Sequence, residues 1–181
     1  MVFTKKTFDQ MLEEIDVSGF VYFSFESPLE VPESHKSRDE GRLGYYLNVE
    51  QKVVDILLSN IPSNSGIIPD RLLEAAIHLS LENSLTRGHN CELYLPYSIK
   101  LFAGREGVVF RIRDSGSGFD YQRHIPEKEA GGRGLTKGAG IGTIILTSPV
   151  FEACYEGTGS VLNIMVKKGY CPERSLALIR G

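Results

Sequence analysis

The glycine-rich part of the chain begins with VVFRIRDSGSG (residues 108–118) and ends with GAGIG (residues 138–142). The first stretch is typical of a β-strand followed by turn residues, and the second directly precedes an apolar segment that favours a helix. Eight of the chain's 19 glycines lie between residues 114 and 142. Apolar residues stand at several positions between them, which is not typical of a flexible linker. Glycine lets backbone N–H groups approach a ligand closely, and a helix N-terminus attracts phosphate. The pattern therefore predicts a nucleotide-phosphate site.

Charged side chains of the same region fit that prediction. Asp114 follows the predicted strand directly, and a carboxylate there can accept a hydrogen bond from an exocyclic amine such as that of adenine. Arg133 and Lys137 lie within the glycine-rich segment and could pair with outer phosphates, or they could simply be solvated. The chain has no Gly-Lys-Ser/Thr sequence, and neither glycine cluster completes a G-x-G-x-x-G pattern. A P-loop and a dinucleotide-binding fingerprint are therefore both excluded.

Four short motifs, in order along the chain, resemble the conserved boxes of the GHKL superfamily of ATP-binding domains. That superfamily includes the ATP-binding domains of gyrase, of histidine kinases and of anti-sigma-factor serine kinases. The resemblance covers roughly residues 66–168. The motifs are Asn83 in a long predicted helix, Asp114-x-Gly116-x-Gly118, Gly138-x-Gly140-x-Gly142 and the Gly157-Thr-Gly159-Ser160 segment before the last predicted strand.

The resemblance implies a Bergerat-type fold and a site for ATP with Mg²⁺. It implies that Asn83 is a ligand of the magnesium ion and that Asp114 binds the adenine amine. Ser160 or Thr158 would support the hydrogen bonds on the adenine side, and residues 120–137 would form a mobile lid. The glycines would have two separate tasks: close approach to the base for Gly116 and Gly118, and wrapping of the phosphates at a helix start for Gly138, Gly140, Ile141 and Gly142.

One position departs from the family pattern. Members that hydrolyse ATP or phosphorylate serine generally carry a glutamate one helical turn before the N-box asparagine, as the general base. Here that position is Leu79, and a hydrocarbon side chain cannot accept a proton. Glu82 is the remaining candidate for a base, but it lies about 100° around the helix from Asn83. Arg87, four residues after Asn83, has two readings: it contacts a phosphate, or it is a cation that stabilises the C-terminus of the helix.

The hydrophobic periodicity predicts an α+β fold, a two-layer sandwich with helices packed on one face of a mixed sheet. We expect a helical N-terminal extension over residues 1–19, an ATP-binding domain over 20–170 and a tail over 171–181. Within them the pattern predicts helices at 7–16, 48–59, 70–87 and 141–150. It predicts strands at 20–25, 91–103, 107–113, 151–156 and 160–167, with a hairpin turn at 104–107.

Composition and net charge argue against several classes of partner and of site. The chain has 181 residues with a formal net charge of −3, so nothing in it favours nucleic acid or an anionic membrane as a partner. No apolar stretch approaches the roughly 20 residues that a membrane helix needs. The N-terminus lacks the apolar run of a signal peptide, and the three cysteines (Cys91, Cys154 and Cys171) form no disulfide or zinc pattern. We expect a cytosolic protein.

Two function classes follow from the resemblance. In the first, the chain is a protein kinase that transfers the γ-phosphoryl group of ATP to a separate partner protein, which is a phospho-acceptor, a sigma factor or a response regulator. In the second, it is a nucleotide-binding regulatory module that responds to ATP or ADP without chemistry, and Leu79 favours this class. A homodimer is an arrangement that the sequence leaves open.

Overall fold

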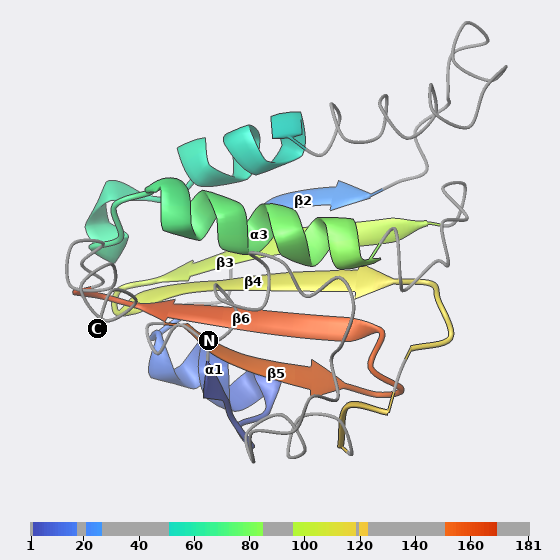
Figure 1. The fold of residues 1–181 in the computed structure, drawn as a ribbon. Helices are drawn as coiled ribbons and strands as arrows, with labels where there is room; N and C mark the ends of the chain where they lie inside the picture. The colour runs from blue at the N-terminus through green and yellow to red at the C-terminus, as the bar shows by residue number, and fades with distance from the viewer. Residues whose placement is uncertain are drawn as a thin grey trace, which may run out of the picture.

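The structure of the chain is a computed structural model that describes residues 2–17, 21–26, 51–84, 96–118, 120–122 and 151–169. Its centre is a six-stranded sheet with the order β1-β5-β6-β4-β3-β2 (Figure 1). All neighbouring strands are antiparallel except β1, which is parallel to β5. The strands are β1 (Val2–Phe3), β2 (Val21–Glu26), β3 (Tyr97–Gly104), β4 (Gly107–Asp114), β5 (Glu152–Glu156) and β6 (Val161–Lys167). Helices and a mixed sheet together make an α+β fold.

The described helices are α1 (Phe8–Glu14), residues 51–59, a 3-10 turn η2 (Ser63–Ser65) and α3 (Arg71–Asn83). The expected helices and strands over these residues are confirmed, as is the hairpin turn between Gly104 and Gly107. The short strand β1 was not predicted. Residues 85–87 of the third expected helix and the whole helix expected at 141–150 lie outside the described residues. None of the described helices is both long and apolar enough to cross a membrane.

Helix α3 forms where a capping residue precedes an amphipathic run. The Asp70 side chain accepts a hydrogen bond from the backbone N–H of Leu73 at 2.9 Å, so the helix begins at Arg71. Leu73, Ile77 and Leu81 recur at helical spacing and are fully buried. Burial of each such side chain stabilises the fold by about 1.5 to 3 kcal/mol. The Gln51 amide donates to the Glu74 carboxylate at 3.0 Å and so links the 51–59 helix to α3.

The main core lies between these two helices and one face of the sheet. Alternate residues of β4 point toward it, namely Val108, Phe110 and Ile112, because successive side chains of a strand face opposite sides. In β6 the corresponding residues are Leu162 and Ile164. The described part of α3 therefore packs along the centre of the sheet.

Helix α1 covers the opposite face of the sheet. Met11 and Ile15 are fully buried in a second core with Val109, Cys154 and Met165, whose side chains point away from α3. The prediction that all helices pack on one face is therefore wrong for α1. The N-terminal elements occupy both edges of the sheet and its second face, because β1 lies at one edge, α1 covers the second face and β2 lies at the other edge (Figure 1).

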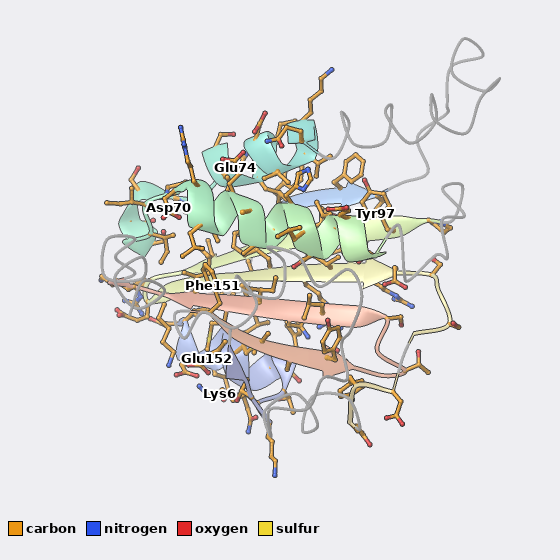
Figure 2. All side chains as sticks on the ribbon, in the orientation of Figure 1. Lys6, Asp70, Glu74, Tyr97, Phe151 and Glu152 are labelled. Carbon is orange, nitrogen blue, oxygen red and sulfur yellow. The ribbon has the colours of Figure 1, made fainter. Side chains whose placement is uncertain are left out.

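Ion pairs fix the start and end of α1 to the sheet. The Lys6 ammonium lies 2.6 Å from a carboxylate oxygen of Glu14 and 2.6 Å from one of Glu152. Lys167 of β6 contacts the same two glutamates, with 3.0 Å between its Nζ and Glu152 Oε1. Figure 2 shows Lys6 and Glu152 side by side near β5. Two cations and two carboxylates thus join α1 and the residue that precedes its cap to β5 and β6.

The end of α1 packs against the β3–β4 hairpin turn. The backbone N–H of Glu106 donates to the carbonyl oxygen of Ile15 at 3.0 Å. A Cβ atom on Gly104 would lie only 1.9 Å from that same oxygen. Glycine at position 104 is therefore required for the close approach of α1, in addition to any role in the turn.

Candidate functional site

Asp114 lies at the end of β4, where the sequence motif placed it. Its backbone N–H donates to the carbonyl oxygen of Ser160 at 3.0 Å, just before β6 begins. Its Oδ1 atom accepts a hydrogen bond from the backbone N–H of Gly116 at 2.9 Å. The Ser115 hydroxyl donates to the Pro96 carbonyl at 2.7 Å. The chain after β4 is therefore an Asx-type turn fastened to the neighbouring strands.

Gly118 and the segment Gly157–Ser160 come into direct contact. Gly118 has φ +73°, and a Cβ atom there would lie 2.1 Å from the carbonyl oxygen of Thr158. Gly157 and Gly159 also have positive φ, at 59° and 93°. The Gly159 N–H donates to the carbonyl of Glu156 at 3.1 Å and closes the turn between β5 and β6. Two motifs about 40 residues apart in the sequence thus meet at one end of the sheet.

Two tyrosine rings pack together near this part of the chain, and the charge of Asp114 acts on one of them, Tyr155. Desolvation raises the pKa of Tyr155 to about 12, and the negative charge of Asp114 adds to that shift. The ring of Tyr121 lies with its centroid 5.6 Å from that of Tyr155. The sequence analysis did not single out either tyrosine. The available signal was the position of Tyr155, two residues before Gly157, in a strand that leads into the last motif.

The described part of α3 carries the candidate catalytic positions. Leu79 is partly buried and packs against the main core. Glu82 is partly buried and directly follows Leu81 of the buried face, and ideal helical geometry separates it from Asn83 by about 100°. Asn83 is the last residue of α3, and its side chain lies outside the described part of the structure.

The described residues therefore include only the predicted adenine end of the site. The predicted phosphate-binding residues all lie outside them: Arg87, Arg133, Lys137, Gly138, Gly140, Ile141 and Gly142. Most of the expected lid over 120–137 does so too. Among the side chains that the structure describes, no three of His, Cys, Asp or Glu are grouped as metal ligands would be. Asp114, Gly116, Gly118 and Ser160, in contrast, lie together.

No protein-family model matches the chain, and no curated protein matches it either. The function proposed below is therefore based on the motifs and on how the described ones are arranged.

Proposed function

We propose that the chain binds ATP with Mg²⁺ in a Bergerat-type version of its α+β fold, and that it phosphorylates or regulates a separate protein in the cytosol. The contact between Gly118 and Thr158 is the observation that carries the proposal. It joins the Asp114-x-Gly116-x-Gly118 box to the Gly157–Ser160 box, which the resemblance assigns to the same adenine pocket.

The chemistry of the described residues fits an adenine. The Asp114 carboxylate at a strand end is an acceptor of the kind that an exocyclic amine requires. Neighbouring glycines let the backbone approach a flat ring closely. Ser160 lies one hydrogen bond away, through the bond from the Asp114 N–H to its carbonyl. Asp114 would therefore bind the base, and Gly116, Gly118 and Ser160 would shape its surroundings.

The remaining roles belong to side chains and residues that the structure does not describe, and they are carried over from the motifs. Asn83 would hold the magnesium ion, which keeps several waters and binds mainly through phosphates. Lys137, Arg133 and Arg87 would supply positive charge. The backbone of Gly138, Gly140, Ile141 and Gly142 would wrap the phosphates at a helix N-terminus. Bound ATP supplies a phosphoryl group that is activated for transfer, and catalysis of such transfer consists mostly of positioning and charge neutralisation.

Two functions share this site. As a kinase, the chain would transfer the γ-phosphoryl group to a separate phospho-acceptor such as a response regulator, and the partner it controls could equally be a sigma factor. A histidine acceptor needs less help from a base, because imidazole is itself a nucleophile. As a regulatory module, the chain would bind a partner according to which nucleotide it holds. Leu79 favours the second function, because its hydrocarbon side chain packs on the main core and offers no base.

Calorimetric titration of the purified chain with Mg-ATP and Mg-ADP tests nucleotide binding directly. We expect binding by the wild type and an affinity at least about tenfold weaker in Asp114→Asn, since a hydrogen bond to a charged acceptor is replaced by a neutral one. Asp55→Asn is the matched control, because Asp55 is exposed on the 51–59 helix and belongs to none of the motifs. Absence of heat and of any thermal shift with both nucleotides would refute the proposal.

Substitution at Leu79 separates the two functions. Leu79→Glu and Leu79→Gln have nearly the same shape and both place a polar group beside the core, but only glutamate is a base. Wild-type transfer of labelled γ-phosphate to a candidate partner would establish the kinase. Nucleotide binding without transfer, together with ATP hydrolysis gained by Leu79→Glu and not by Leu79→Gln, would establish the regulatory module with a lost base.

A further inference from the structure

Three polar side chains form a network on the face of the sheet that α1 covers. The Arg111 guanidinium donates to both carboxylate oxygens of Glu156, at 3.4 and 2.7 Å, and to the Asn163 side-chain oxygen at 3.2 Å. The Asn163 amide returns a hydrogen bond to Glu156 at 3.1 Å. Asn163 is fully buried, while Arg111 and Glu156 are partly buried. Arg111 of β4 and Asn163 of β6 therefore both bind Glu156, the last residue of β5.

The first residue of α1 rests on this network. The guanidinium carbon of Arg111 lies 4.1 Å from the centroid of the Phe8 ring, which is a cation–π contact. Phe8 also meets Phe102 edge to face, with 5.1 Å between the ring centroids. A reciprocal capping box between Thr7 and Gln10 fixes where the helix begins, and hence where Phe8 stands.

The network ends at the candidate adenine site. Glu156 is the last residue of β5, and its carbonyl oxygen accepts the hydrogen bond from Gly159 that closes the β5–β6 turn. That turn presents Thr158 to Gly118 and Ser160 to Asp114. Direct contacts thus run without interruption from Phe8 through Arg111 and Glu156 to the turn.

We propose that α1 controls the candidate nucleotide site through Arg111, which acts as a positioning residue for the Gly157–Ser160 turn. While Phe8 contacts the guanidinium, Arg111 holds the Glu156 carboxylate in one orientation. This orientation in turn fixes the Gly157–Ser160 turn. Displacement of α1 frees Arg111 and loosens the turn. The nucleotide part of this inference rests on the proposed function, but the mechanical part does not.

Coupling of this kind is reciprocal. If docking of α1 tightens nucleotide binding by some factor, bound nucleotide tightens docking of α1 by the same factor. We therefore expect Mg-ADP to slow hydrogen exchange at the amides of α1, such as Met11, although they lie on the opposite face from α3.

Hydrogen exchange of the nucleotide-free chain tests the mechanical part. The amides to follow are those of Gly159 and Asp114, whose acceptors are Glu156 and Ser160. We expect Arg111→Gln to accelerate their exchange roughly 2- to 30-fold. Lys100→Gln is the matched control, because Lys100 pairs in register with Arg111 and loses the same charge on the same face. Equal exchange in Arg111→Gln and in the control would overturn the inference.

Variants of Phe8 separate positioning from general destabilisation. Phe8→Leu keeps an apolar side chain but removes the aromatic face, so we expect faster exchange at Gly159. Phe8→Tyr retains the face and should restore slow exchange. In calorimetry, Arg111→Gln and Phe8→Leu should weaken Mg-ADP binding roughly 2- to 30-fold, and Phe8→Tyr should not.

The outcomes distinguish the two proposals. If the wild type binds no nucleotide, the proposed function fails and the exchange data alone decide whether Arg111 positions the turn. If nucleotide binds but Phe8→Leu and Phe8→Tyr exchange alike, the role of α1 is refuted. Faster exchange at Gly159 with unchanged affinity would refute control of the site.

Discussion

The carbonyl oxygen of Thr158 lies where any residue other than glycine at position 118 would carry its Cβ atom. The separation would be 2.1 Å, and Gly118 also has the left-handed φ of +73°. Two independent constraints therefore require glycine at this position. The first is the backbone conformation and the second is the contact with the β5–β6 turn.

Gly118→Ala should therefore lower the free energy of unfolding by about 2 to 4 kcal/mol, since the left-handed strain and the clash with a backbone atom add together. Urea denaturation measures this loss. Gly157→Ala is the control, because Gly157 has a similar φ of 59° but no atom within 4 Å of the added Cβ. It should cost only about 1 kcal/mol. Equal losses in the two variants would mean that the contact with Thr158 is absent.

The charge of Asp114 should be visible in the titration of Tyr155. Burial and then the Asp114 carboxylate raise the pKa of this phenol to about 12 from its ordinary value of 10.0. Asp114→Asn should lower the pKa of Tyr155 while leaving it above 10.0, because burial remains. Nuclear magnetic resonance of ¹³C-labelled tyrosine measures it. Asp9→Asn, the control, should leave the pKa of Tyr155 unchanged. If Asp114→Asn also leaves this pKa unchanged, the charge of Asp114 does not act on Tyr155.

The same shift has a consequence for stability at alkaline pH. The folded state favours the neutral phenol, so the contribution of Tyr155 is fully present below pH 10 and is lost as the pH rises toward 12. The loss should be smaller in Asp114→Asn, because its Tyr155 pKa is closer to that of the unfolded chain. Urea denaturation at pH 9 and pH 11 checks this difference.

The four-charge cluster of Lys6, Glu14, Glu152 and Lys167 should stabilise the chain only above acidic pH. Hydrogen bonds from Lys167 and then Lys6 lower the pKa of Glu14. Desolvation raises the pKa of Glu152, but hydrogen bonds from Lys6 and Lys167 outweigh it, so that its pKa is also lowered. A lowered carboxyl pKa stabilises the fold above the ordinary value of 4.5, and the contribution is lost as the pH falls below it.

Glu152→Gln should accordingly cost about 0.5 to 1 kcal/mol at pH 7, a modest amount because the charges are partly exposed. At pH 3 the difference from wild type should largely disappear. Urea denaturation at both pH values measures it, with the exposed Glu13→Gln of α1 as the control. A loss of the same size at pH 3 and pH 7 would show that the charge of Glu152 is not responsible.

Docking of α1 should depend on glycine at position 104, because glycine has no Cβ atom. Gly104→Ala would place a Cβ atom 1.9 Å from the Ile15 carbonyl oxygen, so α1 must shift. We expect a loss of about 1 to 3 kcal/mol in urea denaturation. Arg105→Ala, next in the turn, removes only an exposed ion pair to Asp16 and should cost less than about 1 kcal/mol. A larger loss in Arg105→Ala would contradict this account of the turn.

Much of the secondary structure could be predicted because its causes are local. The cap at Asp70 and the helical spacing of Leu73, Ile77 and Leu81 are sufficient to place α3. Gly104 and Gly107 flank a two-residue turn between alternating strands, which identifies the hairpin. The place of Asp114 at a strand end follows from the same local pattern.

Within the described part of the candidate site, the sequence located Asp114 at a strand end and the Gly157–Ser160 segment before β6, but it did not predict their contacts. Asp114 and Gly118 were identified in the sequence, but the closeness of Tyr155 to the carboxylate depends on the register of β5 beside β6. Arg111 and Glu156 were not singled out. They are 45 residues apart and stand side by side only because β4, β6 and β5 are neighbours in the sheet.

Within the described residues, the sequence by itself therefore determined the helices, every strand except β1, the hairpin and the location of the glycine motifs, since each depends on residues within one or two turns of the chain. Only the tertiary structure decided that α1 covers the second face, that Phe8 rests on Arg111 and that Thr158 fills the space beside Gly118. These contacts join residues 40 to more than 100 positions apart. They arise from burial of two apolar faces of one sheet, and hydrophobic burial has no direction that local sequence could reveal.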